Sequence, residues 1–356
     1  MSRWRLTRLD SNLRSLLDTE LPIIQAPMAG VQGSALAIAV SNAGGLGSLP
    51  CAMLSPDAMR AELAAITSGT SRPYNVNFFC HVPPEPDPER EATWRDHLRP
   101  YYEEFGIDIG SAPSGPARAP FSHDAADVLK EFRPRVVSFH FGLPSADLLQ
   151  RVRELGAQVL SSATTVGEAR WLEARGVDAI IAQGVEAGGH RGMFLSDDLT
   201  TQVGTLALVR QIVKAVKVPV IAAGGIADAS GAAAAMRLGA SGVQIGTAYM
   251  LCPEATTSVV HRAALRSERS RHTALTNLFS GRPARGIVNR VMREIGPMSS
   301  LAPQFPLAAT AMAPLRAAAE ARGSSDFSPL WSGQDASGCR EIPAEELTAE
   351  LMGESK

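Results

Sequence analysis

A glycine-rich segment from Gly184 to Gly192 carries a histidine, His190, that could act as a base. The segment reads Gly-Val-Glu-Ala-Gly-Gly-His-Arg-Gly and follows an apolar run that ends at Gln183. Glycines let the backbone approach a flat ligand, and a histidine can exchange a proton near neutral pH. A lone histidine is more often structural, so it is the surrounding loop that favours catalysis or ligand contact at His190.

A second histidine, His140, lies near the end of the apolar run Val136–Gly142. Because side chains alternate along a strand, Ser138 and His140 face one way and Phe139 the other. An inward-facing His140 would either bind an anionic substrate or hydrogen-bond within the protein. The other histidines lie in polar or helical stretches, and we expect them to be solvated: these are His81, His97, His123, His261 and His272.

Two glycine-bearing tips follow neighbouring apolar runs near the middle of the chain. They read Ala-Gly-Gly at 223–225 and Gln-Ile-Gly-Thr at 244–247. Such tips place amide N–H groups against an anion, and loops after the last two strands of a barrel often hold phosphate. Either tip alone could be a simple tight turn. Two in adjacent positions favour a phosphate site.

The elements that must position these residues are short runs rich in Val and Ile, separated by helical patterns. Uninterrupted apolar runs predict strands buried on both faces, and their alternation with helices predicts parallel pairing. Eight such strands make a (β/α)8 TIM barrel the expected fold, with the site at the carboxyl ends of its strands. The predicted strands begin at Pro22, Gly44, Tyr74, Val136, Val159, Ala179, Val218 and Gly242.

Two segments fall outside this repeating pattern. Residues 82–122 contain a charged helical pattern and a Gly/Ser/Pro-rich run, which predicts a loop excursion over the rim after the third strand. Residues 253–356 contain helical pieces around a loop-rich section, Ser280–Pro306, and we expect them to form a C-terminal helical cap on the barrel domain, 1–252. Asn77, a polar residue near the end of an apolar strand, needs a partner that a ligand could supply.

Composition excludes several classes of protein. With 34 basic and 36 acidic residues the net charge is −2, so no basic face indicates a nucleic-acid partner. The four cysteines form no Cys-x-x-Cys pair, and no histidines have metal-ligand spacing, so we expect no metal and a reducing, cytoplasmic setting. No signal peptide or membrane span is expected. A homodimer is one option that the sequence leaves open.

The quoted segments together resemble the nitronate monooxygenases, formerly called 2-nitropropane dioxygenases, of the class I type. The resemblance runs from about residue 20 to the C-terminus in seven ordered motifs. Besides those above, it includes Gln-Ala-Pro-Met at 25–28, Ser-Asn-Ala-Gly-Gly-Leu-Gly at 41–47 and Asn-Val-Asn-Phe-Phe at 75–79.

The resemblance implies an FMN enzyme that oxidises alkyl nitronates, and also nitroalkanes, with O2 and without NAD(P)H; whether its role is detoxification is left open. His190 would then be the base for a neutral nitroalkane, and His140 would help to bind the nitro group. The residues that would hold FMN are Met28, Asn77, Gln183 and Gly188 along its ring and ribityl parts, and Gly224, Gly225, Gln244, Ile245, Gly246 and Thr247 at its phosphate end.

One departure from the family's pattern concerns the substrate. Close relatives carry tyrosines and a lysine in the segment that matches Phe305–Ala313, and this chain has none there. A lysine would suit a substrate carboxylate, so its absence predicts a preference for more apolar nitronates than propionate 3-nitronate. The rival functions are an NAD(P)H-dependent FMN reductase of quinones or enoyl thioesters, and a flavin-free barrel that binds a phosphorylated metabolite.

Overall fold

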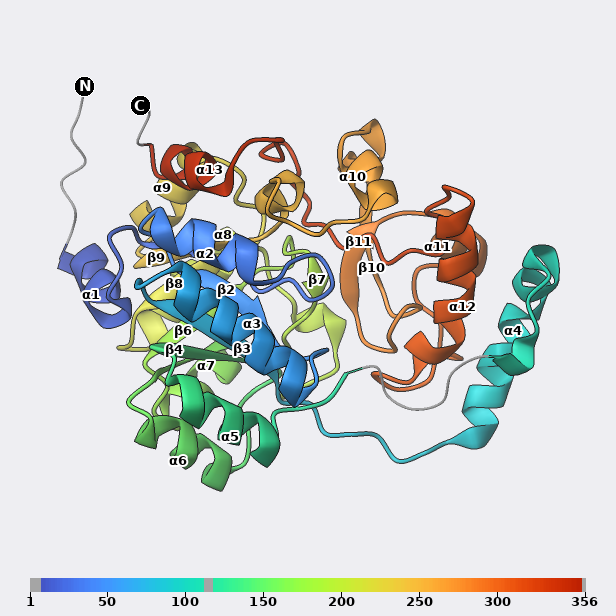
Figure 1. Ribbon diagram of the computed structural model, residues 1–356, viewed down its shortest axis with the longest axis horizontal. Coiled ribbons are helices and arrows are strands. Elements are labelled where there is room, and N and C mark those ends of the chain that lie inside the picture. The colour runs from blue at the N-terminus through green and yellow to red at the C-terminus, as the bar shows by residue number, and fades with distance from the viewer. Residues whose placement is uncertain (1–7, 112–117, 354–356) are drawn as a thin grey trace.

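A computed structural model describes residues 8–111 and 118–353 of the protein, and a barrel of eight parallel strands lies at its centre (Figure 1). The strands follow the order β1-β9-β8-β6-β5-β4-β3-β2, and a bridge between Ile24 and Leu46 joins the two end strands. The predicted (β/α)8 barrel is therefore confirmed. Its strands are β1 (Ile23–Gln25), β2 (Gly47–Pro50), β3 (Tyr74–Phe79), β4 (Val136–His140), β5 (Gln158–Ala163), β6 (Ala179–Gln183), β8 (Val220–Ala223) and β9 (Gly242–Ile245).

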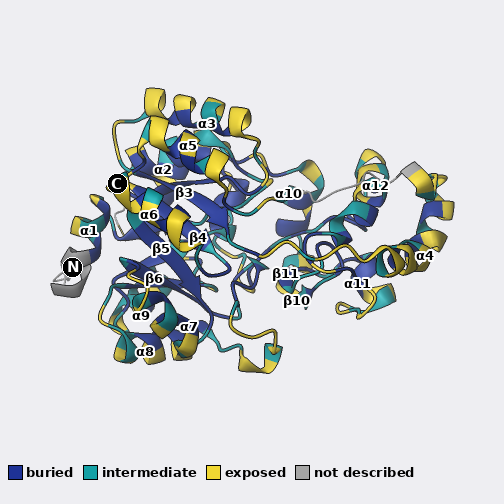
Figure 2. Cartoon of the chain, turned by 90° about the horizontal axis from the view of Figure 1, so that it is seen from below, coloured by how far each residue is buried: buried dark blue, intermediate teal, exposed yellow. Residues whose placement is uncertain are grey.

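Helices surround the barrel and bury their apolar faces against it. Several start where the sequence offers a cap: Ser55 accepts a hydrogen bond from Ala58 N, and Ser122 accepts one from Ala125 N. Figure 2 shows buried strands inside and helices whose outward faces are exposed. Helix α1 (Arg8–Leu17) lies at one end of the barrel, where Leu13 and Leu17 pack with Ile24 and Leu46 of its interior (Figure 1). The surrounding helices are α2 (Ser34–Asn42), α3 (Pro56–Gly69), α5 (His123–Phe132), α6 (Ala146–Glu154), α7 (Val166–Glu173), α8 (Thr205–Ala215) and α9 (Ala229–Arg237).

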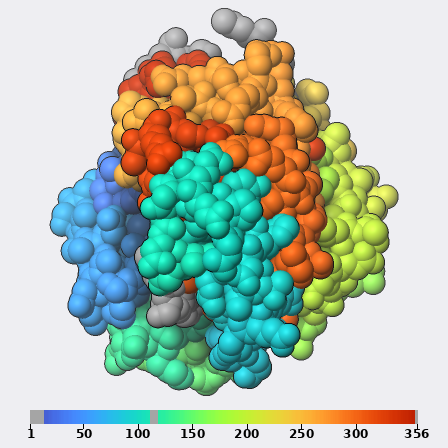
Figure 3. Space-filling model, turned by 90° about the vertical axis from the view of Figure 1, so that its right-hand side faces the viewer, coloured from blue at the N-terminus to red at the C-terminus, as the bar shows by residue number. Residues whose placement is uncertain are grey.

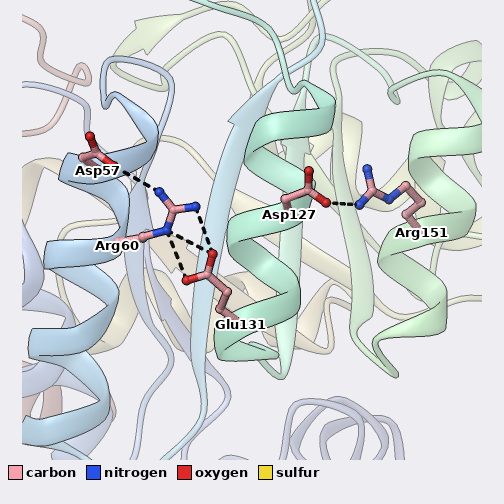
Figure 4. A network of polar contacts seen from close by, with 5 residues as sticks. All are labelled: Asp57, Arg60, Asp127, Glu131 and Arg151. Atoms are coloured by element: carbon pink, nitrogen blue, oxygen red, sulfur yellow. Dashed lines mark hydrogen bonds and ion pairs between the residues drawn. The ribbon is translucent and has the colours of Figure 1, made fainter.

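Ion pairs connect three neighbouring helices on the outer surface of the barrel (Figure 4). Arg60 of α3 contacts Asp57 on its own helix and Glu131 on α5, and Arg151 of α6 contacts Asp127 on α5. These side chains are largely exposed, so water and salt screen the pairs and they add little to stability. The apolar inner faces of the helices determine how they pack.

The excursion after β3 forms a long helix, α4 (Pro88–Phe105), that leaves the barrel and packs against α12 (Ala308–Ala321) (Figure 3). Asp87 caps its start, and Gly106 ends it in the left-handed region at φ 66°. The inward face buries Trp94, Leu98 and Tyr102. The Gly/Ser/Pro-rich run predicted at the end of the excursion falls mainly on residues 112–117, outside the described residues.

A three-stranded antiparallel sheet lies beside the barrel where the sequence predicted mainly loop. Its strands are β10 (Thr273–Thr276), β11 (Ala284–Ile287) and the short β7 (Gly189–His190), in the order β10-β11-β7. Since β7 belongs to the loop after β6, this sheet ties the loop that carries His190 to the C-terminal region.

The C-terminal part of the chain packs both against the barrel and against helix α4. Helix α13 (Ala344–Leu351) returns to the barrel and packs against α2 and α9, where Leu347 and Leu351 join its core. No helix of the described ranges is long and apolar enough to cross a membrane. The remaining elements are α10 (Val259–Leu265), α11 (Arg290–Ile295) and the short 3-10 helices η1 (Ile109–Ser111), η2 (Leu199–Thr201), η3 (Thr247–Leu251) and η4 (Glu268–Arg271).

Candidate active site

One cavity opens at the carboxyl ends of the barrel strands, and all twelve residues predicted for the site line it. They come from the ends of six barrel strands or the loops after them, as expected for a barrel of this kind. The structure therefore brings together residues that lie as far apart in sequence as Met28 and Thr247. The twelve are Met28, Asn77, His140, Gln183, Gly188, His190, Gly224, Gly225, Gln244, Ile245, Gly246 and Thr247.

The tips after β8 and β9 form a glycine-rich end of the cavity. Gly224 and Gly225 have positive φ values of 116° and 67°, and a Cβ at Gly224 would meet Ala187 N at 2.9 Å. A larger residue at Gly224 would thus be strained and crowded, which explains the glycine. A segment near the C-terminus completes this end, because Gly333 N donates a 2.9 Å hydrogen bond to Thr247 Oγ1.

Gln244 carries an unsatisfied polar atom at the same end. Its Oε1 is buried and has no hydrogen-bond partner among the described residues. A buried acceptor without a partner is costly, and a ligand with a donor group would satisfy it. The residues at this end therefore suit a ligand that has both an anionic group and hydrogen-bond donors.

His190 lies at the other end of the cavity, on β7, where it pairs with Ala284 of β11. Its Nε2 is 2.8 Å from Ser280 Oγ, while Nδ1 has no hydrogen-bond partner within the described part of the chain. Burial is the main cause that holds the pKa of His190 well below its ordinary value, and the charge of Arg118 adds to it. At neutral pH the imidazole is uncharged and able to accept a proton.

Both ring nitrogens of His140 are engaged within the protein. Nε2 lies 3.1 Å from the carbonyl oxygen of His190, which can only accept, and Nδ1 lies 2.7 Å from Ser162 Oγ. The neutral ring therefore carries its proton on Nε2 and accepts from Ser162 at Nδ1. Burial lowers the pKa of His140 to about 3. Neither nitrogen is left for a substrate, and the ring instead fixes the backbone at His190.

Gln183 and Arg191 hold the loop that carries His190 through hydrogen bonds. Gln183 Nε2 donates to His190 O at 3.0 Å, and its Oε1 accepts from Gly192 N at 2.7 Å. The fully buried Arg191 donates to the carbonyl oxygens of Gln183 and Gly184 at 2.8 and 2.7 Å. Four charge-assisted or amide bonds thus hold one short loop, so His190 sits on a rigid support.

Aromatic side chains form the wall around His190. The ring centroids of Phe79, Phe305 and Trp331 lie 6.1, 5.2 and 5.5 Å from that of His190. Phe305 belongs to the segment that lacks the lysine and tyrosines of close relatives. Of these three aromatic residues, Phe79 and Trp331 line the cavity itself.

The prediction that the remaining histidines are solvated is wrong for two of them. His81 packs edge-on against Phe305 with centroids 4.8 Å apart, and its Nδ1 is buried without a partner. His261 is buried in the C-terminal region and donates from Nε2 to Trp331 O at 3.1 Å. Both lie in polar stretches of sequence, so only the contacts made by distant segments bury them. Burial lowers the pKa of each to about 4.

Sequence reasoning missed several residues of the site, among them Arg118, Ser280 and Trp331. Arg118 comes from the end of the excursion and lines the cavity, whereas Ser280 and Trp331 come from the C-terminal region. The only signal was a loop-like composition around each residue, with Pro, Gly or Ser within two positions, and that is typical of any loop. Across the described ranges no group of His, Cys, Asp or Glu is arranged to hold a metal ion.

The chain is similar to nitronate monooxygenases over almost its whole length. A family described as nitronate monooxygenase matches residues 10–354. The nitronate monooxygenase of Pseudomonas aeruginosa is 45% identical over 347 residues, covering 95% of this chain and 97% of that protein. The nitronate monooxygenase of Paraburkholderia phytofirmans is 43% identical over 351 residues, covering 97% and 94%.

Two solved structures are similar in fold and in sequence. A nitroalkane oxidase from Streptomyces ansochromogenes has a TM-score of 0.87 and 39% identity, covering 96% of this chain and 97% of its own. FabK from Thermotoga maritima has a TM-score of 0.70 and 28% identity, covering 96% and 94%.

Proposed function

Because the chain belongs to the nitronate monooxygenase family of flavin-dependent oxidoreductases, we propose that it binds FMN and oxidises alkyl nitronates with O2. The products would be a carbonyl compound and nitrite or nitrate, and no NAD(P)H would be consumed. The observation that carries this proposal is the single cavity in which a glycine-rich end and a buried neutral histidine face one space. Nitroalkanes would be further substrates.

The residues of the cavity fit FMN at its phosphate end. A Cβ at Gly224 would meet Ala187 N at 2.9 Å and one at Gly225 would meet Glu186 Cβ at 3.1 Å, so the backbone of this tip can take its course only with glycine at both positions. Glycines of this kind let amide N–H groups approach a phosphate. Gln244 Oε1 lacks a donor, and a hydroxyl of the ribityl chain would supply one. FMN, when bound, would accept electrons from the nitronate and pass them to O2.

Asn77 and Met28 would contact the middle of the flavin. Asn77 Nδ2 is fixed by bonds to the carbonyl and hydroxyl oxygens of Ser138 at 3.2 and 3.0 Å. Met28 N donates a 3.0 Å hydrogen bond to Gln32 Oε1, which fixes the backbone there. Ring and ribityl contacts on such fixed supports orient a bound cofactor against its substrate. Gly188 and Ile245 line the same stretch of the cavity.

His190 is the group we assign as the base for neutral nitroalkanes. With its proton on Nε2 and donated to Ser280, Nδ1 is free to take the proton from the carbon next to the nitro group. A nitronate already lacks that proton, so it needs no base. His140 and Gln183 are assigned positioning roles, because their hydrogen bonds hold the loop of His190.

Oxygen uptake tests the proposed function. FMN-loaded protein is mixed with butyl, hexyl and propionate 3-nitronates in the absence of NADH, and O2 consumption is followed. We expect rapid uptake, fastest with the apolar nitronates because the aromatic wall surrounds His190. Uptake that is far more efficient with propionate 3-nitronate would contradict the apolar preference. Yellow protein without any uptake would contradict the proposal itself.

The second candidate is the rival given by the sequence, an NAD(P)H-dependent FMN reductase of quinones or enoyl thioesters. Anaerobic mixing with NADH or NADPH separates the two functions, because a reductase bleaches its flavin rapidly and a nitronate monooxygenase does not. Protein that stays colourless after incubation with FMN would instead indicate a flavin-free barrel that binds a phosphorylated metabolite.

A further inference from the structure

A nitronate is an anion, and the residues that face it must compensate its charge. The two histidines of the site cannot do so at neutral pH, because burial keeps both uncharged. An unpaired anion in a largely apolar cavity would be costly. A cation is therefore required beside the substrate, if the function proposed above is correct.

Arg118 is the one lysine or arginine among the described residues that line the cavity. The strand-like segment after it crosses the end of β3: Ala119 N donates to Ala52 O at 3.2 Å and Phe121 N to Phe79 O at 2.8 Å. These bonds bring Arg118 to the aromatic end of the cavity. The glycine-rich end, where a flavin phosphate would bind, lies on the opposite strands β8 and β9.

Within the part of the chain that the structure describes, no hydrogen bond or ion pair joins Arg118 to another residue. Arg191, by contrast, donates to two backbone carbonyls and to Gln202 Oε1. The nearby Arg282 donates to Met193 O and stacks on Phe141. A partly buried guanidinium without an acid is available for a ligand anion.

The carboxylate that lines the cavity belongs to a different segment from Arg118. Asp335 is the one carboxylate among the described cavity-lining residues, and its Oδ1 accepts from the backbone and hydroxyl of Ser337. It belongs to the segment of Gly333, which contacts Thr247 at the glycine-rich end. No described acid of the cavity therefore competes for Arg118.

We propose that Arg118 binds the anionic nitronate group itself and is the residue that gives the site its affinity for nitronates. The guanidinium would donate to the nitronate oxygens while the alkyl chain lies along the aromatic wall. This assigns the charge of the substrate to a residue of the excursion, and it explains how a site without a lysine in the Phe305–Ala313 segment can hold an anion.

Three variants test the proposal by steady-state kinetics. Arg118→Gln removes the charge, Arg118→Lys keeps it without the planar fork, and Arg316→Gln removes a neighbouring charge that is paired with Glu320 on the surface. We expect Arg118→Gln to raise KM for butyl and propionate 3-nitronates alike by about 10- to 100-fold. Arg118→Lys should recover part of the loss, and Arg316→Gln should change KM by less than about 3-fold. The flavin content should stay that of the wild type.

The pattern across substrates decides the outcome. A loss confined to propionate 3-nitronate would overturn the proposal, since Arg118 would then bind a second, carboxylate group. Loss of FMN from Arg118→Gln would also overturn it, because the arginine would then serve the cofactor. Unchanged KM values would remove Arg118 from substrate binding altogether.

A binding measurement separates this proposal from the proposed function. Nitrate, a planar anion like the nitronate group, is titrated into the purified protein by calorimetry at constant ionic strength. We expect saturable heat with the wild type and with Arg316→Gln, and none with Arg118→Gln. If the wild type oxidises no nitronate, this titration still decides whether Arg118 forms an anion site, and equal heats in all three proteins would contradict one.

Discussion

Ser280 Oγ lies 2.8 Å from His190 Nε2, and this contact determines which ring nitrogen can meet a substrate. When the ring donates to Ser280, its other nitrogen is the basic one. Because burial keeps the pKa of His190 well below its ordinary value, the free base is present throughout the neutral range. Nδ1 can thus accept a proton at neutral pH without having to release one first.

Replacing His190 by asparagine separates the two steps that a nitroalkane requires. We expect His190→Asn to keep its flavin and to oxidise nitronates at a rate within about 3-fold of the wild type, while turnover of neutral nitroalkanes falls by about 100-fold or more. Oxygen uptake with freshly diluted nitroethane and with its nitronate measures both. Equal losses on both substrates would assign His190 to substrate binding, and unchanged nitroalkane turnover would remove it from the role of base.

At this scale the sequence allowed the glycine tips and the two histidines to be predicted, because they stand at the ends of recognisable strands. Arg118, Ser280 and the buried His81 were missed for a common physical reason. Each owes its place to contacts between segments far apart in the chain, and its own neighbours in sequence are loop-like. The role of His140 also depended on such contacts, since its partners Ser162 and His190 lie on other strands.

The elements of the barrel place tight limits on the loops after β8 and β9. Gly224 has a left-handed φ of 116° and lies close to Ala187 N, whereas Gly156 has a similar φ of 79° with no atom within 4 Å of a Cβ. An alanine would therefore be strained by the positive φ at either position. Only at Gly224 would its Cβ also collide with neighbouring atoms beside the cavity.

Alanine at these two positions should have different effects on the cofactor. Both Gly224→Ala and Gly156→Ala are expected to lower the free energy of unfolding by about 1–2 kcal/mol, because alanine resists a positive φ. Only Gly224→Ala should also weaken FMN, by about 10-fold or more in Kd, measured by flavin fluorescence on titration. Equal FMN affinity in the two variants would argue against a phosphate site at the tip of β8.

Strands and helices were predicted correctly where the local sequence carries a pattern of its own, such as an apolar run or a helix cap. The barrel strands and α4 lie close to their predicted positions because apolar runs and helix caps are local signals. The antiparallel pair β10 and β11 was missed. Both strands are short and mix polar with apolar residues, and they owe their pairing to β7 and the bridge between Gly286 and Trp331.

For the molecule as a whole, buried histidines connect stability to pH. Burial lowers the pKa of His140 to about 3 and those of His81 and His261 to about 4, while an unfolded histidine titrates near 6.5. The unfolded chain therefore binds more protons than the folded protein below pH 6.5. Stability is fully present above that pH and falls as the pH drops toward 4.

Urea unfolding at a series of pH values tests this coupling. Each neutral buried histidine should cost about 1.4 kcal/mol of unfolding free energy per pH unit below its unfolded pKa. We expect His261→Gln, which keeps a donor for Trp331 O, to reduce the slope between pH 6 and 4.5. The same change at the exposed His272 serves as the control. Identical slopes in both variants would show that His261 titrates normally in the fold.

The contact between Gly333 and Thr247 has a consequence for how the protein is made. Its two residues are 86 positions apart, so the contact cannot form until Gly333 has left the ribosome. Helix α13, which anchors that segment to α2 and α9, is synthesised later still. The glycine-rich end of the cavity is thus completed only when segments as far apart as Gly224 and Gly333 have both been made. A product that terminates before Gly333 should therefore be recognisable by its lack of flavin colour.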